Sequence, residues 1–348
     1  MHLPAFIVIK ILVILIACFV IAMAWAPFLI RTLRKWKMGK SIRDTVSAPI
    51  AAGMHAAKEG TPNMGGLVIW MTVAVVMLVL AAGCSLRDQS WCSWSFLSRA
   101  QTLLPLGALI AAALVGFIDD YLNVKKIGPA GGGLRMRHRL LSYTLIASVC
   151  AWWFFSKLQW DSFHVPFVGT YELGWWYVPI FVFVIIATSN AVNITDGLDG
   201  LAGGPLVASF TAYGVIAFTQ GRADLATFCA AIVGALLAFL WYNVPPASFF
   251  MGDTGAMSLG TTLGVIAMLT NQPLLLPIIG LPFVIETLSV IVQIASKKIR
   301  KRKVFKSAPI HHHLEASGWT EPQIVLRMWI VSLFSAGVGV ILALIDRM

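Results

Sequence analysis

The chain has 348 residues, of which 58% are hydrophobic and only 12% are charged, and its mean hydropathy is +0.82. Soluble domains carry about 25% charged residues, so this composition excludes an ordinary soluble protein and indicates an all-α polytopic membrane protein. The net charge of +11 is best explained by basic loops on one side of the membrane, with nucleic-acid binding a weaker explanation. Because no stretch is large enough to fold separately, residues 1–348 are expected to form a single integral membrane domain.

Ten apolar runs follow one another along the chain, and about ten transmembrane helices are therefore expected. The first run contains Lys10 but no small-residue cleavage signature, so it is expected to be a retained helix. The approximate bounds of the runs are 6–28, 66–83, 103–118, 140–156, 176–192, 201–218, 225–242, 256–270, 274–295 and 324–345.

Basic residues are distributed unevenly between the loops that join these runs. The loops after the odd-numbered runs contain most of the lysines and arginines, whereas the opposite loops contain only Arg87, Arg99, Lys157 and Arg222. By the positive-inside rule the basic loops are cytoplasmic and both chain termini face outward. One outward loop contains two cysteines, which can pair if that compartment is oxidising; they are Cys84 and Cys92.

The first cytoplasmic loop ends in Lys58-Glu-Gly-Thr-Pro-Asn-Met-Gly-Gly66. Thr61 precedes a proline and is expected to be extended, and the glycine pair allows close approach to a ligand or a neighbouring helix. Lys58 is a candidate for binding an anionic substrate, although a basic loop that only sets topology is the alternative.

Two adjacent carboxylates, Asp119 and Asp120, end the third run. Adjacent carboxylates repel, and the C-terminus of a helix carries a partial negative charge, so a cation is expected beside them. Mg²⁺ and the lysines at 125 and 126 are the candidates, and a plain boundary between helix and loop is the alternative. The basic, glycine-rich segment 131–139 that follows suits phosphate or anionic lipid headgroups.

The segment 189–204 places two amides and two carboxylates at the end of an apolar run. Asn190, Asn193, Asp196 and Asp199 recur at every third residue, so on a helix they would share one half of the cylinder. A straight helix would spread them over about 13 Å, but the glycines in this segment allow the backbone to break and fold back. We interpret the segment as a functional loop, with a capped helix end as the alternative.

Three more polar groups occur near the remaining runs. Asp253 lies in a Gly-Asp-Thr-Gly turn just before the eighth run, where it can serve as a metal ligand or as a helix N-cap. Glu286 and Gln293 lie two turns apart on one face of the ninth run, and structural hydrogen bonding is as well supported there as function. Three consecutive histidines, His311 to His313, cannot all face one ion on a helix, so contacts to phosphate or solvent are favoured.

Five separated stretches together resemble the phospho-N-acetylmuramoyl-pentapeptide transferase family, within the wider polyprenyl-phosphate N-acetylhexosamine-1-phosphate transferases. The stretches are 60–66, 119–120, 190–200, 250–255 and 309–313, and the resemblance covers nearly the whole chain. It implies a Mg²⁺-dependent exchange between UDP-N-acetylmuramoyl-pentapeptide and undecaprenyl phosphate, giving lipid I and UMP. It also implies a multi-pass protein of the bacterial inner membrane with its active site on the cytoplasmic face, and a homodimer is one oligomeric state that it leaves open.

The resemblance implies a role for each matching residue. Asp253 would ligate Mg²⁺, Asp119 and Asp120 would act on the lipid phosphate or the metal, and His311 would join them in catalysis. The residues expected to bind the nucleotide and the diphosphate are Lys58, Asn190, Asn193, Asp196, Gly197, Leu198, Asp199, Asn243, Phe250, Gln293, His312 and His313, with Phe250 as a platform for the uracil ring.

The sequence departs from the family pattern at several positions. Asn123 replaces a lysine after the aspartate pair, so Lys125 or Lys126 is a candidate substitute, and Asn63 replaces a threonine. The stretch 43–58 is longer than usual and lacks the family's Asp-Gly-Pro-x-Ser-His run. Direct attack by the lipid phosphate and a phospho-enzyme on an aspartate both remain open. The alternative functions are a related transferase of the wider group or, less favoured, a transporter with broken helices.

Overall fold

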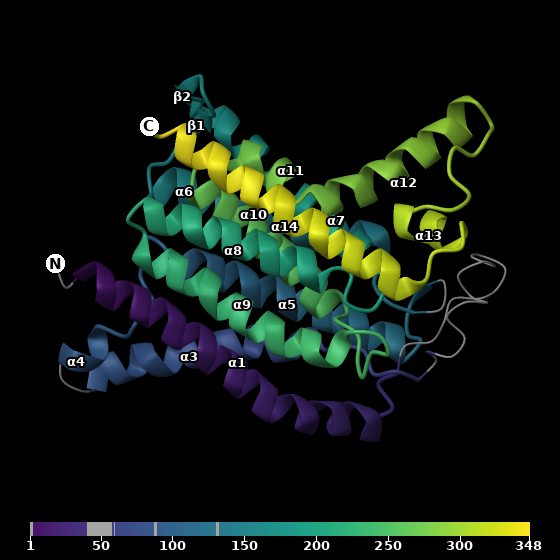
Figure 1. The fold of residues 1–348 in the computed structure, drawn as a ribbon, viewed down its shortest axis with the longest axis horizontal. Coiled ribbons are helices and arrows are strands. Elements are labelled where there is room, and N and C mark those ends of the chain that lie inside the picture. Colours follow the sequence, from purple (N-terminus) through teal and green to yellow (C-terminus); the bar gives the residue numbers. More distant parts are fainter. Residues whose placement is uncertain (1–2, 40–57, 59, 87–88, 130–131) are drawn as a thin grey trace.

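A computed structural model describes residues 3–39, 58, 60–86, 89–129 and 132–348. In this part of the chain helices dominate, and every apolar run forms at least one of them (Figure 1). Most of the unusual 43–58 stretch lies outside the described residues. The helices are α1 (Leu3–Lys35), α3 (Gly66–Leu86), α4 (Gln89–Cys92), α5 (Leu103–Val124), α6 (Met136–Lys157), α7 (Tyr177–Thr195), α8 (Gly203–Thr219), α9 (Ala223–Asn243), α10 (Asp253–Leu269), α11 (Leu276–Ile279), α12 (Leu281–Ile299), α13 (Ile310–Glu315) and α14 (Glu321–Ile345).

The expectation of an all-α polytopic membrane protein is confirmed. Seven of the described helices are long and apolar enough to cross a membrane, and an eighth span results if α11 and α12 form one broken crossing. Two further apolar runs became α8 and α10, each only 17 residues long. Among the described residues, length and composition therefore support seven or eight spans, where the sequence suggested about ten.

The ninth apolar run does not form one straight helix. It begins as a short 3-10 turn, Pro273–Leu275, continues as α11, and bends by 85° before α12. The break falls at Gly280, with Pro282 in the first turn of α12. Glycine weakens a helix and proline lacks the N–H that would continue it, so this pair accounts for the bend.

One small sheet was not predicted from the sequence. Strand β1 (Ser162–Val165) pairs antiparallel with β2 (Gly169–Glu172) between α6 and α7, with Phe163 opposite Tyr171. Such a short hairpin has no long apolar pattern, so hydropathy alone could not reveal it.

Helix α10 forms the centre of the bundle and packs against α5 and α7. Every residue from Thr254 to Leu269 on this helix is buried. Its sequence is rich in glycine, alanine, serine and threonine, and these small residues allow neighbouring helix backbones to approach closely in a membrane protein. The first residue of this central helix is Asp253, so the packing fixes where that carboxylate lies.

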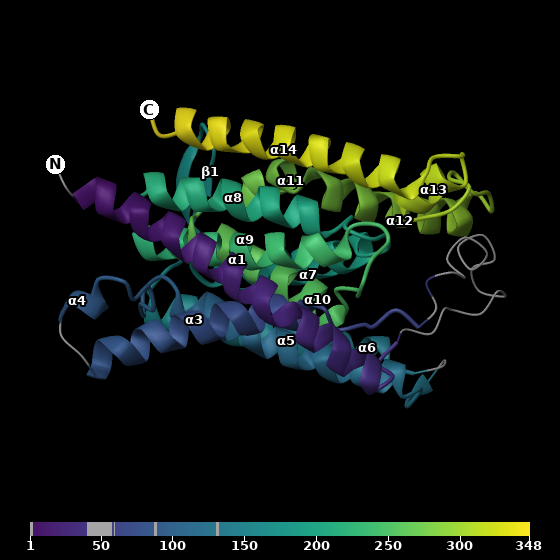
Figure 2. The ribbon, with the colours of Figure 1, turned by 60° about the horizontal axis from the view of Figure 1, so that its bottom comes forward.

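The bundle has two chemically different ends. At the carboxylate end, the C-termini of α5, α7 and α9 meet the N-termini of α10 and α14, and α13 lies nearby (Figures 1 and 2). The disulfide end contains the β-hairpin, both chain termini and the bond between Cys84 and Cys92. That bond, which the sequence left conditional, joins the last turns of α3 to α4.

Candidate active site

Two carboxylates from different helices share one cation at the carboxylate end. Arg139, in the first turn of α6, places its Nη1 atom 2.8 Å from an oxygen of Asp253 and 3.3 Å from an oxygen of Asp119. The Asn193 side chain donates a 2.7 Å hydrogen bond to the other Asp253 oxygen. These four residues, here called the carboxylate cluster, are brought together from α5, α6, α7 and α10. The cation expected beside the aspartates is therefore an arginine.

The lysines favoured from the sequence do not occupy that position. Lys125 and Lys126 are exposed, and the Lys125 ammonium lies 6.0 Å from the centroid of the Tyr121 ring. Asn123, at the position of the missing lysine, is half-buried under the glycine-rich loop. Of the basic segment 131–139, residue 131 lies outside the described residues; the Arg139 side chain reaches both carboxylates, and the Leu134 N–H donates to Asp119.

Asp120 faces a different set of partners from its neighbour Asp119. Its two oxygens accept the backbone N–H groups of Asp253, at 3.1 Å, and Thr254, at 3.0 Å, and it is 3% exposed. The Asn63 amide donates a third hydrogen bond, at 2.8 Å. Asp120 thus satisfies the free N–H groups at the start of α10, a favourable place for a negative charge.

The turn before α10 depends on a glycine. Gly252 has a φ of +72°, in the region that disfavours side chains, and a Cβ atom there would lie 2.5 Å from a carboxylate oxygen of Asp120. The neighbouring backbone is tied to the first loop, since the Phe250 N–H donates to the carbonyl of Pro62 and the Phe250 carbonyl accepts from Gly65. The Pro62–Gly66 stretch therefore supports the Asp253 turn, as the sequence suggested for a close approach. Phe250 itself is half-buried there.

Lys58 forms a second charged group with two acidic side chains. Its ammonium lies 2.8 Å from Asp199 and 2.6 Å from Glu321, the first residue of α14. Glu321 also accepts the backbone N–H of Asp199 at 2.7 Å. Lys58 therefore ties the loop after α7 to the start of α14, and sequence patterns had not singled out Glu321.

Several predicted binding residues make structural contacts, either hydrogen bonds to nearby backbone atoms or apolar packing. The buried Asn243 side chain accepts from the Gly200 N–H and donates to the Phe249 carbonyl, both at 2.9 Å. Leu198 is buried in an apolar cluster with α14. Asn190 donates to the carbonyl of Ile186 one turn earlier. Asp196 caps the C-terminus of α7 and is half-buried.

The three histidines have three different environments. His311 is buried beside Glu286, with 2.9 Å between Nδ1 and a carboxylate oxygen. His312 lies 2.7 Å from Glu315 in the same short helix, and His313 accepts the Lys306 N–H. Among the other predicted residues, the buried Gln293 side chain accepts the backbone N–H groups of residues 304 and 305, which places the loop before the histidines.

The segment 193–199 connects these groups. Asn193 belongs to the carboxylate cluster, Gly197 lies against the His311 ring, and Asp199 pairs with Lys58. Helix α7 ends at Thr195 and α8 begins at Gly203, so the chain breaks where the sequence predicted. Side chains at every third residue thereby reach separate partners around one end of the bundle.

The donor atoms of the carboxylate cluster fit a hard divalent cation. Asp119 and Asp253 present oxygens to the same arginine atom, which shows that a single positive charge can meet both. No group of three or more His, Cys, Asp or Glu side chains arranged to hold a metal occurs within the described part of the chain. Mg²⁺ commonly takes only one or two carboxylates, with water and phosphate oxygens as its other ligands, so the cluster is chemically suitable.

Comparison with known proteins gives one consistent result. Residues 102–271 match the model of glycosyl transferase family 4. A phospho-N-acetylmuramoyl-pentapeptide-transferase of Chloroflexus aggregans is 41% identical over 94% of this chain and 88% of its own length. Proteins of the same name from Desulfosudis oleivorans and Bacillus anthracis are 40% and 41% identical, over 93% and 92% of this chain and over 90% and 94% of their own lengths.

The chain belongs to the phospho-N-acetylmuramoyl-pentapeptide transferase family. It is therefore a membrane transferase, and the resemblance found in its motifs is confirmed. Asn63, Arg139 and Glu321 are site residues whose contacts sequence analysis did not predict. For Arg139, the only sequence signal was the basic character of the segment 131–139.

Proposed function

We propose that this transferase moves phospho-N-acetylmuramoyl-pentapeptide from its UDP carrier to undecaprenyl phosphate, which yields lipid I and UMP. The observation that carries the proposal is the shared cation between Asp119 and Asp253. Transfer between two phosphates brings negative charges together, and a site with convergent cations and hydrogen-bond donors is what such a reaction needs. The names of its relatives support the substrate.

The carboxylate end is proposed to face the cytoplasm of a bacterial inner membrane. Two independent features support this orientation. The basic segment 297–303, at the end of α12 and in the loop after it, lies at this end, as the positive-inside rule requires of a cytoplasmic face. The bond between Cys84 and Cys92 lies at the other end, and disulfides persist in oxidising compartments outside the cytoplasm.

The proposed roles combine these contacts with the resemblance to the family. Lys58 and Asp199 are proposed to bind the nucleotide portion together with Asn190, Asp196, Gly197, Leu198 and Phe250. Asn193, Gln293, His312 and His313 are proposed to line the diphosphate path, and Asn243 supports it through Gly200. Arg139 neutralises Asp119 and Asp253 and is available to a phosphate oxygen. Asp120 is proposed to act by placing the start of α10 rather than by touching the substrate.

Mg²⁺ is proposed as the cofactor, held by Asp253 with Asp119 beside it. When bound, it would neutralise charge on the diphosphate. The lipid phosphate is already an anionic nucleophile, so Asp119 needs at most to accept its remaining proton. In the direct reaction, an oxygen of the lipid phosphate bonds to the phosphorus next to the sugar. The bond from that phosphorus to the bridging oxygen breaks, and UMP leaves with the electron pair.

The test is release of UMP by the purified full-length chain in detergent with undecaprenyl phosphate. UDP-N-acetylmuramoyl-pentapeptide is expected to give UMP only when Mg²⁺ is present, and Asp253→Ala is expected to lose at least a hundredfold in rate. Asp346→Asn, at the disulfide end, is the matched carboxylate control and should keep full activity. Preferential turnover of UDP-N-acetylhexosamines without the peptide would instead assign the chain to the wider transferase group. A covalent phosphosugar trapped on an aspartate would replace direct attack with the phospho-enzyme route.

A further inference from the structure

A glutamate that the proposed reaction does not use lies against one of the site histidines. Glu286 on α12 is 0% exposed and His311 at the start of α13 is 1% exposed. One carboxylate oxygen of Glu286 lies 2.9 Å from Nδ1 of His311 and 3.4 Å from the His311 backbone nitrogen. This oxygen therefore fixes both the position of His311 and the orientation of its ring.

The other ring nitrogen of His311 points toward the loop after α7. A Cβ atom built on Gly197 would lie 2.3 Å from Nε2, so only the absence of a side chain lets the ring approach that backbone. Among the described residues, Nε2 of His311 and the second oxygen of Glu286 are buried atoms without a hydrogen-bond partner. An unpartnered buried polar atom is costly, and at a functional site it marks a position where another group can bind.

The neighbouring histidines do not share this arrangement. His312 is half-buried and pairs with Glu315 three residues later on its own helix, and His313 stacks edge-on against Phe305. The His311 pair joins two helices that are separate in the sequence, since Glu286 lies 25 residues earlier. The carboxylate therefore connects the broken α12 to the edge of the proposed substrate site.

We propose that Glu286 is a positioning residue that holds the His311 ring so that Nε2 is presented to the diphosphate of the nucleotide substrate beside Gly197. The inference rests on the proposed function and deepens it. A carboxylate bonded to one ring nitrogen sets which nitrogen carries the proton and leaves the other in a fixed direction. Diphosphate oxygens only accept hydrogen bonds, so Nε2 would contact them as an N–H donor, and its direction is set by the bond between Nδ1 and Glu286.

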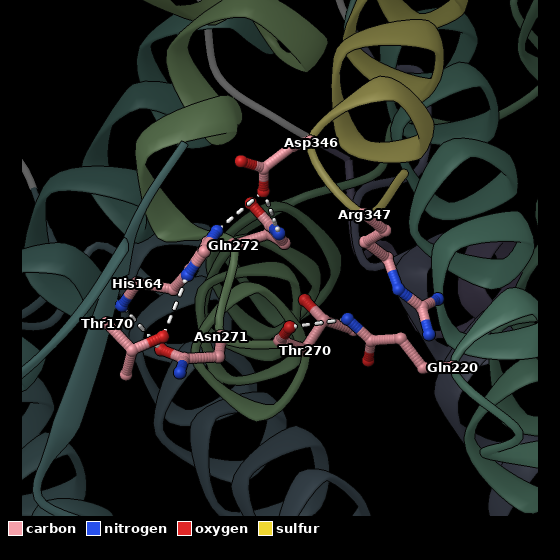
Figure 3. A pocket seen from close by; sticks show the side chains of 8 residues that line it. All are labelled: His164, Thr170, Gln220, Thr270, Asn271, Gln272, Asp346 and Arg347. Carbon is pink, nitrogen blue, oxygen red and sulfur yellow. Dashed lines mark hydrogen bonds and ion pairs between the residues drawn. The ribbon is translucent and has the colours of Figure 1, made fainter. Parts of the chain in front are cut away.

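A second histidine and carboxylate pair, at the disulfide end, provides a matched control. His164 on β1 pairs with Asp346 just after α14, beside a cavity of about 190 Å³ that Gln272 and Arg347 also line (Figure 3). Burial alone would raise the pKa of Asp346, but hydrogen bonds from the Phe167 N–H and from His164 outweigh burial and lower it. Removing the Asp346 carboxylate should therefore lower the stability of the protein without changing its kcat/KM.

The experiment compares Glu286→Gln, His311→Asn, the double variant and Asp346→Asn in the UMP-release assay, alongside thermal unfolding of each. Glu286→Gln is expected to lower kcat/KM about tenfold to a hundredfold, the usual effect of losing a carboxylate that orients a functional histidine. In the His311→Asn background the same change should alter kcat/KM by less than about twofold, because its effect passes through His311. Asp346→Asn should unfold at a lower temperature with unchanged kcat/KM.

Two results would overturn the inference while leaving the proposed function intact. One is a Glu286→Gln enzyme that behaves like Asp346→Asn, less stable but equally active. The other is a full, multiplicative effect of Glu286→Gln in the His311→Asn background. If Glu286→Gln does not fold, Glu286→Asp takes its place, since it keeps the charge but withdraws the carboxylate by one methylene. A wild-type chain that releases no UMP from its proposed substrates would refute the proposed function instead.

Discussion

Replacing Asp120 with alanine tests whether this residue anchors a helix or acts on the substrate. Its carboxylate accepts the N–H groups of Asp253 and Thr254 and the amide of Asn63; the bonds from Thr254 and Asn63 are buried, and the bond from Asp253 is partly buried. Alanine would leave these donors without an acceptor. The start of α10 would then be free to shift, and Asp253 would shift with it.

The size of the effect follows from these three hydrogen bonds. A buried donor left without its partner costs about 1–3 kcal/mol, although some of this is regained where water can enter. A loss of roughly 3–5 kcal/mol is therefore expected for Asp120→Ala, similar to removing one partner of a buried ionic contact. At about 2–4 °C per kcal/mol, the unfolding temperature should fall on the order of 10 °C. Asp120→Asn keeps one oxygen acceptor and should lose only about 1–2 kcal/mol.

The chain itself supplies a suitable probe of unfolding. Its three free cysteines, Cys18, Cys150 and Cys229, are buried, so a thiol-reactive dye should become fluorescent only as the helices separate. Asp119→Ala is the matched neighbour, because Asp119 accepts the Leu134 N–H and contacts Arg139, and its contact with α10 is to the Asp253 side chain rather than to the helix backbone. It should lose activity to a similar degree with a clearly smaller fall in unfolding temperature.

A particular outcome would refute this assignment. If Asp120→Ala unfolded at the wild-type temperature and was nevertheless inactive, Asp120 would have to act directly on the metal or the lipid phosphate. Equal losses of stability for the Asp119 and Asp120 variants would also remove the distinction drawn here between an anchor and a reacting carboxylate.

Three further predictions concern other parts of the molecule. Lys58→Met leaves Asp199 without its cation, so the KM for the UDP substrate should rise about tenfold, which corresponds to ~1.4 kcal/mol of binding free energy. An unchanged KM in steady-state assays would count against nucleotide binding by Lys58 and Asp199. Reducing the bond between Cys84 and Cys92, eight residues apart, should lower the free energy of unfolding by about 2.5 kcal/mol, measured by thermal unfolding. The value of kcat should not change, because the bond lies far from the carboxylate end. Folding lowers the pKa of Asp346, so the stabilisation from its carboxylate is complete above the unfolded-state pKa and is lost as the pH falls through the folded-state pKa. The difference in unfolding temperature between wild type and Asp346→Asn should therefore be largest at pH 7 and shrink below about pH 4.

Long apolar runs allowed the sequence to predict most of the helices. A membrane-spanning helix needs a long, uninterrupted apolar stretch, and both its length and its hydropathy can be read from the local sequence. The bend at Gly280 was missed because a glycine and a proline in an apolar run can be tolerated. The hairpin of β1 and β2 was missed because a four-residue strand carries almost no periodic signal. Helices α8 and α10, with 17 residues each, are shorter than the other long helices of the bundle, a difference that their apolar runs did not reveal.

The polar residues of the site were predictable as a set, but their partners were not. Unusual carboxylates and amides at the ends of apolar runs stand out because each is costly near a membrane. Which cation would meet Asp119 depends on how α6 packs beside α5, and no local pattern distinguishes Arg139 from Arg135 or Arg137. Lys125 and Lys126 were favoured because they lie closest in the sequence, yet they follow the last residue of α5 in an exposed turn.

The contrast between Asp119 and Asp120 shows why adjacent residues in a motif need separate tests. Consecutive side chains on a helix point about 100° apart, so two carboxylates at the end of α5 must face different neighbours. One meets the guanidinium of Arg139, and the other meets the N–H groups that open α10. A motif match assigns both aspartates to catalysis. From the contacts we instead propose that Asp119 supplies negative charge to the site and that Asp120 holds Asp253 in position. Since both variants would be inactive, only stability measured beside activity can separate the two roles.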